Sequence, residues 1–336
     1  MNKTFIVAEL SANHNGSLDV AKKTILAAAE SGADAVKLQT YTADTLTIEC
    51  DKPNFQIKSE TLWDGLTLYE LYKKAYTPWE WHEELFAYGR SLGLTVFSTP
   101  FDYTAVDFLE ELSNPIIKIA SFEAMDYLLI AYAAKKMKPM VISTGVLSLE
   151  EIGNAVKTCR NAGNNDITLL VCTSEYPAKP EDAQLLKIKD LKGRFDVNVG
   201  LSDHTMGIAV ASAAVALGAS MIEKHFTLDR SADDVDSAFS MEPVAFKQMV
   251  ESIRIVEQAV SPPDYSKISP GRKFARSLFV VKDIAAGQEF TKDNLRSIRP
   301  SNGLHPGFYP EILGKKAVIP IERGTPLSWD LIDTGM

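Results

Sequence analysis

The sequence predicts an α/β protein: a closed barrel of eight parallel strands with surrounding helices, then a small β-rich module. Short apolar runs alternate with helical segments from residue 5 to about residue 260. Polar side chains collect where these runs end. The breaker cluster Ser261-Pro262-Pro263-Asp264 then precedes a segment without apolar periodicity. We expect a (β/α)8 barrel catalytic domain at 1–260, a linker at 261–275 and a small domain at 276–336.

Eight apolar runs are the expected strands, and amphipathic stretches with apolar residues at helical spacing lie between them. A doubly wound open sheet is the alternative, but it usually has fewer strands, and no Gly-rich dinucleotide-binding turn follows the first run. The expected strands are 5–9, 35–39, 95–98, 116–120, 140–143, 168–172, 197–201 and 221–224. The clearest expected helices are 17–30, 104–112, 149–161 and 243–259.

Composition excludes several classes of protein. Hydrophobic residues make up 46% and charged residues 24% of the 336 residues, as in a globular protein with a large core. A net charge of -9 argues against nonspecific binding to nucleic acid or to an anionic membrane. The sequence shows no signal-peptide pattern and no apolar run near the roughly 18 residues that span a bilayer, so we expect a cytoplasmic protein. The scattered Cys50, Cys159 and Cys172 indicate neither a disulfide framework nor a thiolate zinc site.

Two histidines follow expected strands that are neighbours along the chain. His204 ends Gly200-Leu201-Ser202-Asp203-His204, and His225 lies in Ile222-Glu223-Lys224-His225-Phe226, with one helix-length segment between them. The ends of adjacent parallel strands lie roughly 5 Å apart, so imidazoles at matching positions could share one metal ion. Either histidine alone would more often be a hydrogen-bonded structural residue. The pair favours a metal site.

Three lysines lie inside expected strands, where a buried ammonium is costly unless an anion is present. They are Lys37, Lys118 and Lys224, and hydroxyl side chains such as Thr99 and Ser143 end other strands. Lysines neutralise an oxyanion and hydroxyls donate to it without adding charge, which favours a phosphate or carboxylate pocket. Two alternatives stay open. Each lysine can pair with a structural carboxylate, and a Schiff-base aldolase also uses a strand lysine. The candidate carboxylates are Glu9, Asp203 and Glu223.

A string of motifs, in order along nearly the whole chain, resembles the sialic acid synthase family. The motifs are Ala8-Glu9, Asn13-His14-Asn15-Gly16, residues 32–39, Ser98-Thr99-Pro100-Phe101-Asp102, Lys118-Ile119-Ala120-Ser121, Ser143-Thr144-Gly145, Ser202-Asp203-His204-Thr205 and residues 223–229. Residues 233–240, Asp-Asp-Val-Asp-Ser-Ala-Phe-Ser, resemble the pseudaminic acid synthase branch. Neuraminate and legionaminate synthases usually read Gly-Pro-Asp-His there, which leaves them as the alternative.

The resemblance implies a TIM barrel, and it implies that residues 276–336 form an antifreeze-like (SAF) domain. It further implies that phosphoenolpyruvate condenses with an N-acetylated amino sugar, 2,4-diacetamido-2,4,6-trideoxy-L-altrose for the pseudaminate branch, with release of phosphate. A divalent metal, Mn2+, Mg2+ or Co2+, is implied on His204 and His225. In the family the small domain docks on the other subunit of a domain-swapped homodimer, where the residue matching Arg299 reaches the sugar. Without the resemblance, Arg299 reads as a solvated surface charge.

Carried over residue by residue, the resemblance also implies a site. Glu9 matches a glutamate near the metal-bound water, with His204 and His225 completing the catalytic set. Contact with the acceptor sugar is implied for Gln39, Tyr176 and Asp236, although Asp236 reads equally as a loop cap. His14 and His82 are interpreted as structural. The implied phosphoenolpyruvate pocket consists of Lys37, Thr99, Lys118, Ser121, Ser143 and Ser202.

Two rival classes remain at this stage. A metal-dependent or Schiff-base aldolase would use the same barrel on pyruvate itself and would release no phosphate. A noncatalytic sugar-binding or ice-binding protein would account for the small C-terminal module, but it gives no purpose to the strand lysines and the paired histidines.

Overall fold

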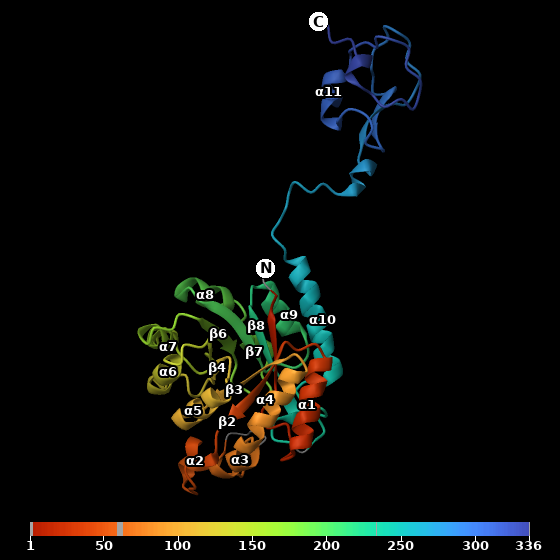
Figure 1. Cartoon of the computed structure of the whole chain (residues 1–336). Helices are drawn as coiled ribbons and strands as arrows, with labels where there is room; N and C mark the ends of the chain where they lie inside the picture. The colour runs from red at the N-terminus through yellow and green to blue at the C-terminus, as the bar shows by residue number, and fades with distance from the viewer. Residues whose placement is uncertain (1–2, 59–62, 233, 336) are drawn as a thin grey trace. The chain divides into compact units, whose positions relative to one another are not determined.

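The structure is a computed structural model that describes residues 3–58, 63–232 and 234–335. The chain forms two compact units, Met1–Ser261 and Pro262–Met336, and each is described by itself (Figure 1). Among the described residues, no helix combines the length and the apolar character needed to cross a membrane.

The first unit is a closed parallel barrel, which confirms the predicted fold. Each strand pairs in parallel with the next, and β8 closes the barrel on β1, where Glu9 pairs with His225. Observed strand ends differ from the predicted ones by at most two residues, and β1 and β5 match at both ends. Strand β7, for example, continues to Asp203 because it stays paired with β8 up to Lys224. The strands are β1 (Phe5–Glu9), β2 (Ala35–Thr40), β3 (Thr95–Pro100), β4 (Ile117–Ile119), β5 (Met140–Ser143), β6 (Ile167–Cys172), β7 (Asn198–Asp203) and β8 (Met221–His225).

Helices surround the barrel on its outer side (Figure 1). Local sequence explains where several begin: Ser17 accepts a hydrogen bond from Val20 N at the start of α1, and Ser148 forms a capping box with Glu151 at the start of α7. The helices are α1 (Leu18–Glu30), α2 (Ala43–Leu46), α3 (Leu68–Ala75), α4 (His82–Ser91), α5 (Tyr103–Glu111), α6 (Tyr127–Ala134), α7 (Leu149–Asn161), α8 (Lys187–Phe195), α9 (Ala209–Ala216) and α10 (Pro243–Ala259).

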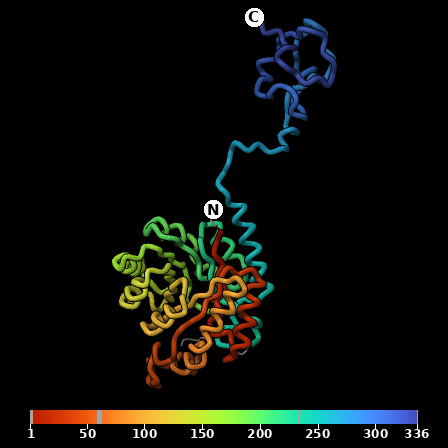
Figure 2. Tube along the Cα trace, viewed as in Figure 1, coloured from red at the N-terminus to blue at the C-terminus, as the bar shows by residue number. Residues whose placement is uncertain are grey.

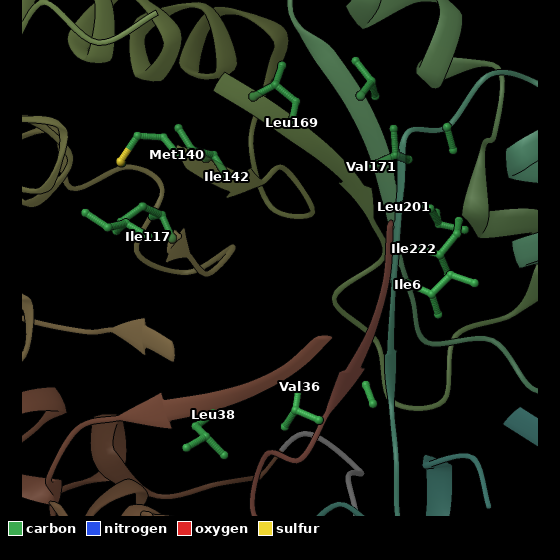
Figure 3. Packing of buried hydrophobic residues seen from close by; sticks show 14 of the residues in the cluster. Ile6, Val36, Leu38, Ile117, Met140, Ile142, Leu169, Val171, Leu201 and Ile222 are labelled. Carbon is green, nitrogen blue, oxygen red and sulfur yellow. The ribbon is translucent and has the colours of Figure 1, made fainter. Parts of the chain in front are cut away.

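Two apolar cores flank each strand, because successive side chains point to opposite faces. The outer core packs strand residues such as Ile6, Val36 and Ile222 against the helices (Figure 3). The inner core fills the barrel with side chains that alternate with the outer set. Its buried members are Val7, Ala35, Phe97, Val141, Leu170 and Met221. Two residues further along each strand, the inner positions become polar.

The second unit is a small β-rich module built around its own apolar core. Its chain trace is the blue part of the tube in Figure 2. Strands β9 (Ser277–Val280) and β10 (Leu295–Ile298) pair antiparallel, and a short helix, α11 (Tyr309–Ile312), follows. Turns at Gly287 and Gly324 adopt φ of 78° and 94°, a region that favours glycine. The core consists of Leu278, Val280, Ile284, Phe290, Leu295, Ile312, Ala317, Ile321, Leu327 and Ile332.

Candidate active site

A buried polar layer lies above the inner core, at the carboxyl ends of the strands, where barrel enzymes carry their sites. Alternation along each strand explains it: Glu9 is two residues beyond Val7, Lys37 two beyond Ala35, and Glu223 two beyond Met221. The inward positions of this layer are Glu9, Lys37, Thr99, Lys118, Ser143, Cys172, Ser202 and Glu223.

An ion network joins β1, β2, β4 and β8. Lys37 Nζ lies 2.9 Å from Glu9 Oε2 and 3.8 Å from Glu223 Oε2, and Lys118 Nζ lies 3.7 Å from Glu223 Oε1. Burial raises the pKa of Glu9 to about 7, despite the nearby Lys37. For Glu223, burial is outweighed by Lys118 and Lys37, so its pKa lies below the ordinary value. The site thus pairs an ionised carboxylate with a carboxyl that titrates near neutrality, a division of roles typical of acid–base sites.

Lys118 is a buried cation with few partners. Within the described residues its ammonium makes one hydrogen bond, a 3.4 Å contact to the carbonyl of Ile119. Burial lowers its pKa, which the nearby Glu223 opposes without cancelling. An ammonium carries three donors, so this one has capacity left for an anion. Lys37 is better satisfied: it also donates to Thr99 Oγ1 at 3.2 Å, and Glu223 and Glu9 together raise its pKa against the effect of burial.

Lys224 does not join the other two lysines, so the expectation of a three-lysine pocket is wrong for this residue. It follows Glu223 on β8 and therefore points to the opposite face of the barrel wall. There its ammonium lies 2.6 Å from Asp203 Oδ2 and donates to the carbonyl of Thr205. The contacts of Lys224 agree with the alternative interpretation, in which this lysine forms a structural ion pair.

Hydroxyl groups line the inner side of the same layer. Ser121 Oγ accepts a 3.0 Å hydrogen bond from Gly145 N, and Ser202 Oγ donates to Glu223 Oε1 at 3.0 Å. Gly145 has no room for a side chain, since a Cβ there would lie 2.3 Å from Ser174 Oγ and 2.9 Å from Ser121 Oγ. The predicted Thr99, Ser121, Ser143 and Ser202 are all buried.

The two histidines lie side by side at the ends of β7 and β8. Asp203 pairs with Lys224 in the strand register, so the next residues, His204 and His225, occupy matching positions, with ring centroids 5.3 Å apart. His204 Nδ1 lies 2.6 Å from the carbonyl of Thr173 and therefore carries the proton, so that in the neutral ring the lone pair is on Nε2. Burial lowers the pKa of His204, but Cys172 and the Thr173 carbonyl outweigh it and raise that pKa above the ordinary value, so a cation would displace a proton from this ring. His204 is buried, and the side chain of His225 is only 12% exposed.

These imidazoles fit a divalent cation. Within the described residues Nδ1 of His225 is buried without a hydrogen-bond partner, which makes it available to a ligand. Burial, reinforced by His204 and Lys37, holds the pKa of His225 well below its ordinary range, so the ring is neutral, as metal binding requires. No cluster of three or more metal-ligating side chains occurs in the described part of the chain. A metal on this pair would keep open positions for other ligands, as catalytic metals do.

Of the three residues expected at the acceptor sugar, two lie beside the histidines and the third contacts Glu9. The Tyr176 ring lies 4.4 Å from His204, centroid to centroid, and Asp236 Oδ2 lies 3.9 Å from His225 Nδ1. Gln39 Nε2 donates to Glu9 Oε1 at 2.9 Å. Asp236 accepts from the Ser11 hydroxyl and ties its loop to the end of β1, so it is more than a loop cap. Asp233, in the motif of residues 233–240, lies outside the described residues.

The other two histidines of the barrel have partners outside this layer. His14 packs edge-on against Trp81, and His82 Nε2 lies 2.9 Å from Thr40 Oγ1. Burial lowers the pKa of both to about 4. These contacts agree with structural roles. Arg299 belongs to the second unit, where its side chain is exposed.

Comparison with known proteins accounts for both units. Residues 24–264 match the NeuB family, and residues 275–333 match the SAF domain. The chain belongs to the NeuB family. This membership confirms the sialic acid synthase resemblance and the expected SAF domain.

Individual NeuB relatives extend over nearly the whole chain. A pseudaminic acid synthase of Helicobacter pylori is 50% identical, covering 98% of this chain and 98% of its own. An N,N'-diacetyllegionaminic acid synthase of Legionella pneumophila is 37% identical, covering 98% and 94%. The crystal structure of an N-acetylneuraminic acid synthetase from Leptospira borgpetersenii, in complex with citrate, superposes with a TM-score of 0.72 at 29% identity, covering 81% of this chain and 90% of that one.

Sequence reasoning gave four residues of this region no part in the chemistry. Glu223 was considered only as a structural partner of a lysine, yet it contacts both site lysines. The available signal was its position two residues after Met221, which puts both side chains on the inner face of the barrel. Cys172 Sγ lies 4.0 Å from His204 Nδ1, and Ser174 lies in the loop after β6. Ser11 follows β1 and bonds both Gln39 and Asp236. Nothing in the sequence alone indicates that bridge.

Proposed function

We propose that this protein condenses phosphoenolpyruvate with 2,4-diacetamido-2,4,6-trideoxy-L-altrose and water to give pseudaminic acid and phosphate. The identity of 50% with a pseudaminic acid synthase, against 37% with a legionaminic acid synthase, supports this acceptor. The observation that carries the chemistry is the buried, under-partnered ammonium of Lys118, in the same layer as Cys172, which interacts with Ser121 and His204. Such a cation needs an anion, and phosphoenolpyruvate supplies a carboxylate and a phosphate.

The phosphoenolpyruvate pocket is proposed to consist of two cations and several hydroxyls. Lys37 and Lys118 act as point charges toward the carboxylate and phosphate. The hydroxyls donate to the remaining oxygens without adding charge. They belong to Thr99, Ser121, Ser143 and Ser202.

The reaction joins C3 of phosphoenolpyruvate to the aldehyde carbon of the open-chain sugar. Water then adds at C2, and the C2–O bond to phosphate breaks; the two protons of the water end on the new hydroxyl and on the phosphate. Glu9 is the proposed acceptor of a proton from that water, and its pKa of about 7 supports this role because it suits a general base near neutral pH. Gln39 and Lys37 fix its carboxyl from two sides.

His204 and His225 are the residues proposed to hold the divalent metal that the family resemblance implies; Mn2+, Mg2+ and Co2+ are the candidates. When bound, such an ion supplies Lewis-acid polarisation of the aldehyde and a site for water. Tyr176 packs over His204 and helps to fix the orientation of its ring.

Arg299 is proposed to complete the acceptor site from the other subunit of a domain-swapped homodimer. The SAF domain match and the exposed side chain support this assignment. A domain of this size gains stability by docking on a partner surface.

The test is incubation with phosphoenolpyruvate, Mn2+ and a panel of acceptor sugars, with phosphate release and product mass as readouts. We expect phosphate release and a nine-carbon product with the diacetamido altrose, and poor use of N-acetylmannosamine. Preference for N-acetylmannosamine or for a legionaminate precursor would assign the chain to the alternative branches. Product formation from pyruvate, without phosphate release, would favour an aldolase. No turnover of any sugar, with binding retained, would favour a noncatalytic sugar-binding protein.

A further inference from the structure

Ser11 is a buried serine in a backbone conformation that favours glycine. It follows β1 directly, its φ is 48°, and only 3% of its surface is exposed. A side chain in this left-handed region is strained, and such strain persists where surrounding contacts demand it. The neighbouring Asn15 has a similar φ of 46° but is exposed. The two residues therefore share the strain and differ in their surroundings.

The Ser11 hydroxyl bridges two residues of the proposed acceptor site. It donates to Asp236 Oδ2, and the same carboxylate also accepts from Ala12 N. A hydroxyl has one proton, so toward any further partner Ser11 can only accept. That further partner is Gln39, whose Nε2 lies 2.9 Å from Ser11 Oγ.

This bridge fixes which way the Gln39 amide faces. Its Nε2 donates one proton to Ser11 Oγ and the other to Glu9 Oε1, both at 2.9 Å. Both neighbours are acceptors, so the opposite amide orientation would place three acceptors together. The carbonyl oxygen of Gln39 must then point away from them. It has no donor within the described residues, and the side chain is only partly buried.

We propose that Ser11 is a positioning residue that sets the hydrogen-bond polarity of the acceptor site. Ser11 donates its only proton to Asp236, so its oxygen must accept from Gln39. The Gln39 amino group therefore donates to Ser11 and to Glu9. Gln39 is thereby fixed as an acceptor, which selects an N–H or O–H donor on the sugar. The inference rests on the proposed function and adds a specificity device to it.

The test is Ser11→Gly in the full-length protein, because glycine removes the hydroxyl and relieves the backbone strain together. We expect kcat/KM for 2,4-diacetamido-2,4,6-trideoxy-L-altrose to fall about tenfold to a hundredfold, the effect of losing one to two oriented hydrogen bonds. The preference for this sugar over N-acetylmannosamine should shrink. The KM for phosphoenolpyruvate should stay within about twofold of wild type, and the melting temperature should stay near that of wild type, because relief of the backbone strain offsets the lost hydrogen bonds.

Two further variants separate the hydroxyl from the backbone. Ser11→Ala keeps the strain and should lose the same acceptor kcat/KM, with a lower melting temperature than Ser11→Gly. Asn15→Gly relieves matched strain in the same loop and should leave both substrates unaffected. Wild-type phosphate release tests the proposed function by itself. With active wild type, an unchanged acceptor kcat/KM in Ser11→Gly, or an equal rise in the KM for phosphoenolpyruvate, would overturn the role of Ser11 alone.

Discussion

At the scale of single residues, Lys118 and Lys224 show that the same type of side chain can have two different roles. Both are buried strand lysines whose pKa is lowered by burial. Lys224 faces outward and is paired with Asp203, whereas Lys118 faces inward with one long hydrogen bond. The sequence places both on strands. A structural lysine differs from one available to a ligand in whether its side chain points out of or into the barrel, and in which groups it contacts.

This contrast gives a matched pair of variants. Lys118→Ala should raise the KM for phosphoenolpyruvate about tenfold to a hundredfold and change the KM for the acceptor far less, because a charge-assisted hydrogen bond contributes about 1.5–3 kcal/mol. Lys224→Ala should lower the melting temperature, since it leaves Asp203 buried and unpaired, with the KM for phosphoenolpyruvate near wild type. Steady-state kinetics and thermal melts measure both. An unchanged KM in Lys118→Ala would place this lysine in a structural ion pair.

The histidine pair supports a second prediction. His204→Ala and His225→Ala should each abolish turnover at ordinary Mn2+ concentration, because neither ring can replace the other as a ligand. Calorimetry should show weakened Mn2+ binding, and circular dichroism should show retained secondary structure. Since His204 is buried and the side chain of His225 is largely so, we also expect a lower melting temperature from the space that is left. Near-normal phosphate release by either variant would remove the metal-site proposal.

At the scale of elements, the loop after β4 carries a carboxyl with no part in the proposed chemistry. Burial raises the pKa of Glu123 from about 4.5 to about 7, and its Oε2 has no hydrogen-bond partner within the described residues. A carboxyl whose pKa is higher in the folded state favours folding only while protonated. Its contribution is therefore complete below about pH 4.5 and is lost as the pH rises through about 7.

Glu123→Gln removes this titration while keeping the shape of the side chain. At pH 8 we expect the variant to melt roughly 3–6 °C above wild type, and at pH 4.5 the two should melt together. Differential scanning calorimetry across this range measures the difference. A constant difference at both pH values would mean that the ionisation of Glu123 does not affect stability.

The strands were predictable because hydrophobic alternation and spacing specify them locally. The segment between β2 and α4 was not, and the structure places α2 and α3 there. Helix α3 begins at a capping box of Thr67 and Glu70, a local signal that does not indicate where the helix packs. The residues of the site also fall into a predictable and an unpredictable group. Strand-end residues such as Glu9 and His225 were identifiable, whereas the Ser11 bridge depends on a loop from the far end of the barrel sequence.

At the scale of the whole molecule, the two units divide the proposed chemistry. The barrel supplies the ion network, the hydroxyls and the histidine pair, all within strands that pair with one another. The second unit supplies Arg299, on a module with its own core. The sequence shows the change in composition between the units, and the family resemblance alone connects Arg299 to the acceptor. The proposed link between them is therefore best tested by mixing variants of the full-length protein.

Complementation between two inactive variants provides that test. If Arg299 acts on the partner's barrel, mixing Arg299→Ala with Glu9→Ala protein should restore activity. In a heterodimer one barrel keeps its own Glu9 and receives the intact Arg299 of the other chain, whereas the second site has lost both residues. Random exchange makes half of the dimers mixed, so activity should approach about a quarter of wild type. Native mass spectrometry should confirm exchange, and each variant alone should stay inactive. Demonstrated exchange without recovered phosphate release would show that Arg299 acts within its own chain or has no part in the reaction.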